Sequence, residues 1–139
     1  MSTYADTSDI ARLKHEAPVW AVVGLGANPD RPAYGVARFL QAQGKRIVPV
    51  YPRAEVVHGE QGHASLAEAA AAVGHIDVVD CFVNSSRVGA IVDEAIAIGA
   101  SAVWLQLDVI DEAAAQRAEA AGLTVIMNRC PAIEFPRIP

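Results

Sequence analysis

Five short apolar runs alternate with longer segments of helical character, and this alternation limits the fold more than any other feature. The runs span residues 19–24, 46–50, 76–82, 101–106 and 123–127. The segments 33–43, 65–74, 85–99 and 112–121 between them carry apolar or alanine-rich helical patterns that end near glycines. Strands that alternate with helices predict an α/β protein whose parallel sheet is covered on both faces. We expect a Rossmann-like doubly wound sheet of five strands in the order 3-2-1-4-5, counted along the chain.

The ligand site of such a sheet is expected at the carboxyl ends of the strands, where the strand order reverses. In the predicted order this point lies beside the first strand. Four segments would surround it: the loop 24–35, the turn after Val50, the residues that follow Phe82, and the end of the fourth strand near Gln106.

The glycine-rich loop after the first strand indicates an anion site. Gly24 and Gly26 let a ligand approach the backbone, and the N-terminus of the following helix attracts phosphate. The dinucleotide fingerprint is incomplete, since Pro29 stands where a third glycine is required and the nearest acid after the second strand is Glu55, beyond a proline. Arg31 offers a cation suited to phosphate. The pattern favours a nucleotide phosphorylated on its ribose, with an ordinary strand–helix turn as the alternative.

The composition excludes several classes of function. A chain of 139 residues suits one domain, and a net charge of −5 without a basic run disfavours nucleic-acid binding. Neither a secretory signal nor an apolar run of the ~18 residues that span a membrane is present. Cys81 and Cys130 make no disulfide framework or metal cluster and fit a reducing cytoplasm. We therefore expect a cytoplasmic protein with a lead segment, 1–17, a Rossmann-like domain, 18–139, and an extended or looped tail.

Several stretches together resemble a known family. They are 24–35, 34–40, 48–52, 76–82, 91–100, 104–107 and 121–131. In these stretches the chain is similar to the small stand-alone CoA-binding proteins, which are related to the CoA-binding domain of the succinyl-CoA synthetase alpha subunit. The sequences Trp104-Leu-Gln and Arg129-Cys-Pro are particular to the stand-alone proteins. The resemblance implies CoA as the ligand, a Rossmann-like fold and no established reaction.

Two departures from the family pattern fall at the expected site. A Phe-Arg-Asn-Ser stretch of the family reads Phe82-Val83-Asn84-Ser85, which removes an arginine. A Gln-Leu-Gly stretch reads Gln106-Leu107-Asp108, which adds a carboxylate. Both changes disfavour an anionic ligand.

The candidate ligand-binding residues follow from the loops and the resemblance. Arg31 is the first candidate for a phosphate contact, and a surface pair with Asp30 is its structural alternative. Tyr34 either contacts the ligand or packs at a helix start. No catalytic or metal-binding residue is assigned. The complete set is Gly24, Leu25, Gly26, Asn28, Pro29, Arg31, Tyr34, Gly35, Tyr51, Pro52, Arg53, Phe82, Val83, Asn84 and Gln106.

Three hypotheses of function remain at this point. The leading one is a non-catalytic module that binds CoA or acyl-CoA. The second is an enzyme that acts on acyl-CoA or another nucleotide through Cys130, whose pKa a nearby Arg129 would lower, or through Asp108. The third is a regulatory protein with a degenerate site. Self-association and a protein partner are open in each case.

Overall fold

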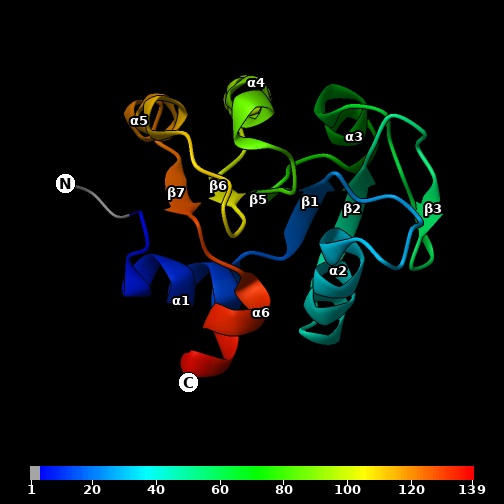
Figure 1. Ribbon diagram of the computed structural model, residues 1–139, viewed down its shortest axis with the longest axis horizontal. Helices are drawn as coiled ribbons and strands as arrows, with labels where there is room; N and C mark the ends of the chain where they lie inside the picture. Colours follow the sequence, from blue (N-terminus) through cyan, green and yellow to red (C-terminus); the bar gives the residue numbers. More distant parts are fainter. Residues whose placement is uncertain (1–3) are drawn as a thin grey trace.

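Five parallel strands form the centre of the computed structural model, which describes residues 4–139 (Figure 1). Each predicted apolar run contains one of them, so the Rossmann-like doubly wound sheet is confirmed. Their side chains are buried almost throughout, as expected for a parallel sheet that is covered on both faces. The strands are β1 (Val19–Val23), β2 (Arg46–Val50), β5 (Val78–Cys81), β6 (Ala102–Leu105) and β7 (Thr124–Met127).

The predicted strand order is wrong in one respect. The observed order β2-β1-β5-β6-β7 corresponds to 2-1-3-4-5 along the chain, not to 3-2-1-4-5. β2 lies at the edge because it contains Pro49, which has no N–H to donate. The Pro49 carbonyl points away from β1 and accepts the N–H of His63 at 2.9 Å. The segment after β2, which contains α3, leads past β1 to β5. β5 pairs with the edge of β1 that is not paired with β2. The order therefore reverses between β1 and β5.

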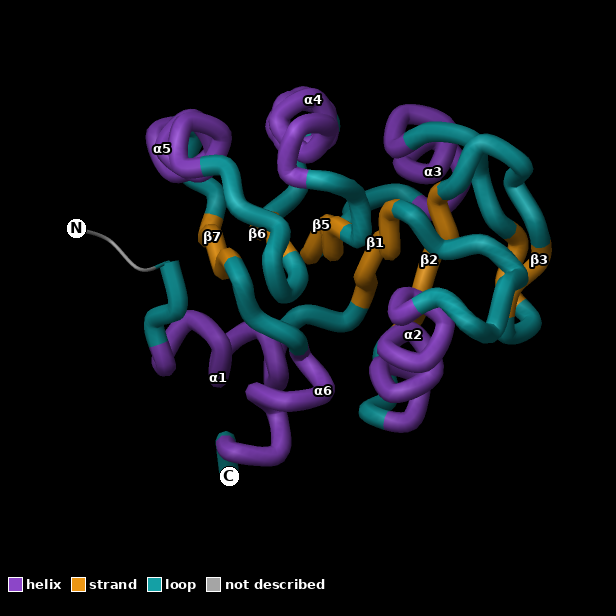
Figure 2. Tube along the Cα trace, in the orientation of Figure 1, coloured by secondary structure: helices purple, strands orange, loops and turns teal. Residues whose placement is uncertain are grey.

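Helices cover both faces of the sheet (Figures 1 and 2). α3 (Leu66–Val73), α4 (Ser85–Ala97) and α5 (Glu112–Ala120) lie on one face. α1 (Thr7–Glu16), α2 (Pro32–Ala42) and α6 (Pro131–Glu134) lie on the other. A small antiparallel hairpin of β3 (Val56–Val57) and β4 (Glu60–Gln61) stands beside β2. No helix in the part of the chain described, from residue 4 onward, is long and apolar enough to cross a membrane.

The tail folds back over the sheet, which differs from the expected extended or looped conformation. α6 is followed by a 3₁₀ turn, Phe135–Arg137. The ring of Phe135 packs edge-on against the rings of Trp20 and Trp104, with centroid distances of 5.8 and 5.9 Å. These three aromatic rings are completely buried, so the tail covers a large apolar area of β1 and β6.

The lead segment also packs against this face. Ile10 and Leu13 of α1 are buried in the same apolar cluster as Trp20 and Phe135. Residues 1–3 of the expected segment 1–17 lie outside the described residues.

Phe135→Ala is expected to lower the free energy of unfolding by about 3–5 kcal/mol, because it leaves a cavity between two buried tryptophans. Ile133→Ala is the matched control, since Ile133 is 42% exposed on α6, two residues before Phe135, and should change stability by less than about 0.5 kcal/mol. Denaturant unfolding measures both values. Equal losses would contradict the role given to the tail.

Candidate ligand-binding site

Three adjoining cavities open at the carboxyl ends of the strands, and all three are lined by Gly24 and Arg31. The α4 cavity, about 440 Å³, also includes Arg53, Val83 and Arg87. The β6 cavity, about 530 Å³, continues from it to Gln106, Asp108 and Cys130. The edge cavity, about 400 Å³, extends to Gly26, Asn28 and Glu55. They surround the point between β1 and β5 where the strand order reverses.

Most of the predicted site residues line these cavities. They are Gly24, Gly26, Asn28, Arg31, Tyr51, Pro52, Arg53, Phe82, Val83, Asn84 and Gln106. The other four are placed elsewhere. Leu25 is buried in the core, Pro29 is exposed in the loop, and Gly35 is exposed on α2. The ring of Tyr34 packs against His58 with a centroid distance of 4.2 Å, which fits the packing alternative.

Gly24 joins the two loops that form the site. Its φ of +99° is strained for any residue with a side chain. A Cβ atom there would lie 2.5 Å from the carbonyl oxygen of Phe82. The N–H of Gly24 donates to Val50 O at 2.8 Å, and the N–H of Phe82 donates to Val23 O at 2.9 Å. Glycine therefore allows the loops after β1 and β5 to touch, which brings the helices that follow them to one place.

The helices α2 and α4 both begin at these cavities without a side-chain cap. The side chains of their N-cap residues, Arg31 and Asn84, accept no hydrogen bond from the helix, and neither first turn contains an acidic residue. In contrast, α1, α3 and α5 are capped by the side chains of Asp6, Ser65 and Asp111. An uncapped helix N-terminus presents its partial positive charge to whatever lies in front of it. Two such termini therefore favour an anion in the shared space.

Three arginines add full positive charge. Arg31, Arg53 and Arg87 line the α4 cavity, and none of them forms an ion pair with another described residue. The alternative pair of Arg31 with Asp30 is not formed. Instead, the N–H of Asp30 donates to Asn28 Oδ1 at 2.9 Å.

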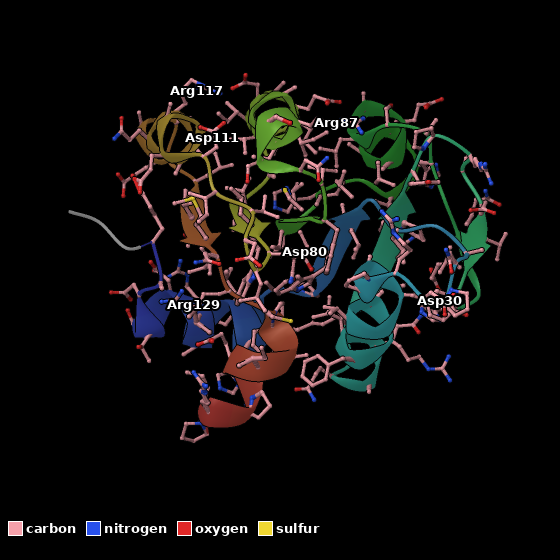
Figure 3. The ribbon with its side chains drawn as sticks, viewed as in Figure 1. Asp30, Asp80, Arg87, Asp111, Arg117 and Arg129 are labelled. Carbon is pink, nitrogen blue, oxygen red and sulfur yellow. The ribbon has the colours of Figure 1, made fainter. Side chains whose placement is uncertain are left out.

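Arg87 is a site residue that the sequence analysis missed. It lies in the first turn of α4, on the side that faces α3 (Figure 3). The family pattern has an arginine where this chain has Val83. Arg87, four residues later, lines the same cavity and supplies a positive charge there. The sequence did contain a signal for this residue: Arg87 comes three residues after Asn84, the N-cap of the helix that follows β5.

The Glu55 side chain forms a hydrogen bond to the glycine-rich loop. Its Oε1 accepts the N–H of Ala27 at 3.1 Å, and it lies in the edge cavity with Arg31 and Arg53. Glu55 therefore occupies one of the loop N–H groups that a phosphate would use, so an anion in the edge cavity has to compete with a carboxylate.

Two buried polar side chains have oxygen atoms without a hydrogen-bond partner among residues 4–139, and of the two only Gln106 lines the β6 cavity. Gln106 is only 4% exposed, and its Oε1 has no hydrogen-bond partner among residues 4–139. Asp80 on β5 is completely buried near the middle of the molecule (Figure 3), and neither of its oxygens has a partner in the same range. Burial raises the pKa of Asp80 well above its usual value, so its carboxyl group is protonated over a wider pH range than an exposed aspartate.

The environment of Cys130 corrects an expectation from the sequence. Arg129 does not lower its pKa, because the Arg129 guanidinium donates to Asn128 O instead. Burial raises the pKa of the Cys130 thiol, while hydrogen bonds from Ala132, Ile133 and Gln106 act in the opposite direction. Cys130 is therefore a protonated thiol at neutral pH and a poor nucleophile.

Asp108 stands at the rim of the β6 cavity in a left-handed conformation, with φ of +66°. The family pattern has glycine there, which adopts this conformation without strain. The Asp108 N–H donates to Asn128 Oδ1 at 2.8 Å, and its carbonyl accepts the hydroxyl of Ser85. These bonds hold the loop after β6 in place.

Comparison with known proteins agrees with this geometry. A family model described as a CoA binding domain matches residues 18–136. The chain belongs to this CoA-binding family. The uncharacterised protein YneT of Bacillus subtilis (strain 168) is 34% identical over 123 residues, which cover 88% of this chain and 89% of YneT. The predicted family resemblance is thereby confirmed.

Solved structures show the same fold. A hypothetical protein from Pyrococcus horikoshii OT3 is similar with a TM-score of 0.88 and 32% identity, over 96% of this chain and 92% of that one. The apo form of the acetyl-coenzyme A synthetase 1 of Ca. Korarchaeum cryptofilum is similar with a TM-score of 0.71 and 21% identity. That match covers 86% of this chain and 28% of the synthetase, so the likeness shows a shared fold.

Asp80→Asn is expected to remove a pH dependence of stability. The folded state keeps the Asp80 carboxyl protonated at pH values where the unfolded chain, with an ordinary pKa of 3.8, is ionised. The unfolded state then binds fewer protons, so the contribution of Asp80 to the free energy of unfolding is fully present below about pH 4 and is lost as pH rises. The slope is about 1.4 kcal/mol per pH unit until the folded-state pKa is reached.

Denaturant unfolding of both proteins from about pH 4 to about pH 8 measures this effect. The stability of Asp80→Asn relative to the wild type should rise across the window. A difference that is constant with pH would mean that Asp80 is ionised in the folded protein.

Proposed function

We propose that the chain is a non-catalytic module that binds CoA or acyl-CoA, with the phosphates held by Arg31, Arg87 and the N-terminal ends of α2 and α4. The observation that carries the proposal is the convergence of two uncapped helix termini and three unpaired arginines on one cavity. CoA carries a diphosphate and a ribose phosphate, and both suit guanidinium groups and helix N-termini. Membership of the CoA-binding family supports this ligand over other anions.

The residues fit CoA in a second respect. The site lacks an acidic residue at the position that holds the ribose hydroxyls of NAD, and Arg53 stands in the turn after β2. The exposed ring of Tyr51 and the adjoining Pro52 offer a surface on which a base can stack. In this proposal Arg31 and Arg87 bind charge, Gly24 and Gly26 admit the ligand to the backbone, and Val83 and Phe82 supply an apolar wall.

A thiolate mechanism has less support. The sequence left open an enzyme that uses Cys130, but burial raises the pKa of the Cys130 thiol, and burial also raises the pKa of Asp80, the carboxyl group that acts on it, so Asp80 is kept protonated. Asp108 is exposed at the rim and is held by its backbone rather than oriented by its side chain. We therefore propose binding and not turnover as the activity of the isolated chain.

Arg31→Ala is expected to weaken CoA binding by roughly ten- to a hundredfold, because a charged hydrogen bond to phosphate contributes about 1.5–3 kcal/mol. Arg87→Ala should weaken binding in the same direction. Added salt should reduce the affinity of the wild type more than that of Arg31→Ala, since the variant lacks one screened charge contact. Isothermal titration calorimetry with CoA at two salt concentrations measures each effect.

Arg46→Ala is the matched control. Arg46 is exposed at the amino end of β2, opposite the site, and its loss changes the net charge by the same amount. It should leave CoA affinity unchanged. If Arg31→Ala binds CoA as tightly as the wild type, the phosphates do not lie at Arg31. Binding of NAD without binding of CoA would overturn the proposal.

A further inference from the structure

The edge cavity contains a carboxylate in contact with the loop that is expected to bind an anion. Glu55 Oε1 accepts the N–H of Ala27 at 3.1 Å, and a Cβ atom on Gly26 would lie only 3.0 Å from the same oxygen. Arg31 and Arg53 line this cavity, yet neither forms an ion pair with Glu55 or with any other residue among 4–139. The carboxylate therefore takes a backbone donor of the loop and leaves the two guanidinium groups unpaired.

The backbone around Glu55 is fixed by its neighbours. Ala54 has a left-handed conformation, with φ of +50°, which costs free energy for a residue with a side chain. Its N–H donates to Tyr51 O at 2.8 Å, and its carbonyl accepts Gln61 Nε2 at 3.1 Å. Gly62 packs so closely that a Cβ atom there would lie 2.3 Å from the Glu55 carbonyl oxygen. A strained and hydrogen-bonded turn thus fixes where the Glu55 side chain begins, while the side chain itself is only partly buried and is free to turn to water.

We propose that Glu55 is an internal competitor of the ligand: its carboxylate occupies a phosphate position of the glycine-rich loop while the site is empty, and a phosphate group of CoA displaces it. The inference rests on the proposed CoA-binding function and adds a control on the occupancy of the same site. A carboxylate and a phosphate accept the same N–H and are attracted by the same arginines, so the two exclude each other there. Free phosphate makes few other contacts, so this competition leaves it weakly bound, whereas CoA gains affinity from the rest of the molecule.

Two substitutions separate competition from a purely structural role. Glu55→Gln keeps an oxygen that can accept the Ala27 N–H but removes the negative charge, and Glu55→Ala removes both. If Glu55 competes, both variants should bind CoA more tightly than the wild type. The gain should be roughly three- to tenfold for Glu55→Gln, because a hydrogen bond to a charged acceptor is about twice as strong as one to a neutral acceptor. If Glu55 only holds the loop in shape, Glu55→Gln should bind as the wild type does and Glu55→Ala should bind more weakly.

Isothermal titration calorimetry with CoA, and with inorganic phosphate as a competitor at constant ionic strength, measures these affinities. Phosphate should also bind Glu55→Gln more tightly than the wild type, by a similar factor, because it meets the same carboxylate. Glu60→Gln is the matched control, since Glu60 on β4 is partly buried, carries the same charge and lines none of the three cavities. It should leave both affinities unchanged.

The failures of the two proposals are distinguishable. CoA binding to the wild type with no gain in Glu55→Gln overturns the competition while CoA binding stands, and so does a complex with CoA in which Glu55 Oε1 still accepts the Ala27 N–H. A gain of equal size in Glu60→Gln would trace the effect to net charge and would overturn the competition as well. Absence of CoA binding by the wild type and by both Glu55 variants overturns the proposed function, and the competition with it.

Discussion

The site depends on a backbone contact between the loop after β1 and the loop after β5. Gly24 makes this contact possible, since a side chain at φ +99° would be strained and would meet the Phe82 carbonyl. Parallel pairing of β1 with β5 places the two loops at the same edge, and each loop leads into a helix. The contact therefore brings the N-termini of α2 and α4, which lie on opposite faces of the sheet, to one cavity, and Arg31 and Arg87 stand at these two termini.

Two cavities of different character flank the contact. The protein as a whole is acidic, yet Arg31, Arg53 and Arg87 face the α4 cavity without ion pairs among the described residues. A local positive field within an acidic chain attracts a phosphorylated ligand to one place and disfavours extended polyanions elsewhere. The β6 cavity on the other side is mainly apolar, with Arg31 and Asp108 as the charged residues among those that line it in the described chain. One site thus combines a positively charged part with a mainly apolar part.

Much of this arrangement was predictable from the sequence, and the failures have identifiable causes. The five strands were predictable because an apolar run between two turn signals is a property of a short stretch of sequence. The strand order depends on long-range pairing, and the local signal that bears on it, Pro49 in an edge strand, was not used. Arg87 was missed because it comes from a helix rather than from a loop next to the glycines. The protonated state of Cys130 depends on burial and on where Arg129 points, and neither follows from adjacency in sequence.

A crystal structure of the chain in complex with CoA tests the central claim most directly. The account predicts the diphosphate of CoA at Arg31, in front of the N-termini of α2 and α4. Phosphates bound away from Arg31 and Arg87 would contradict it.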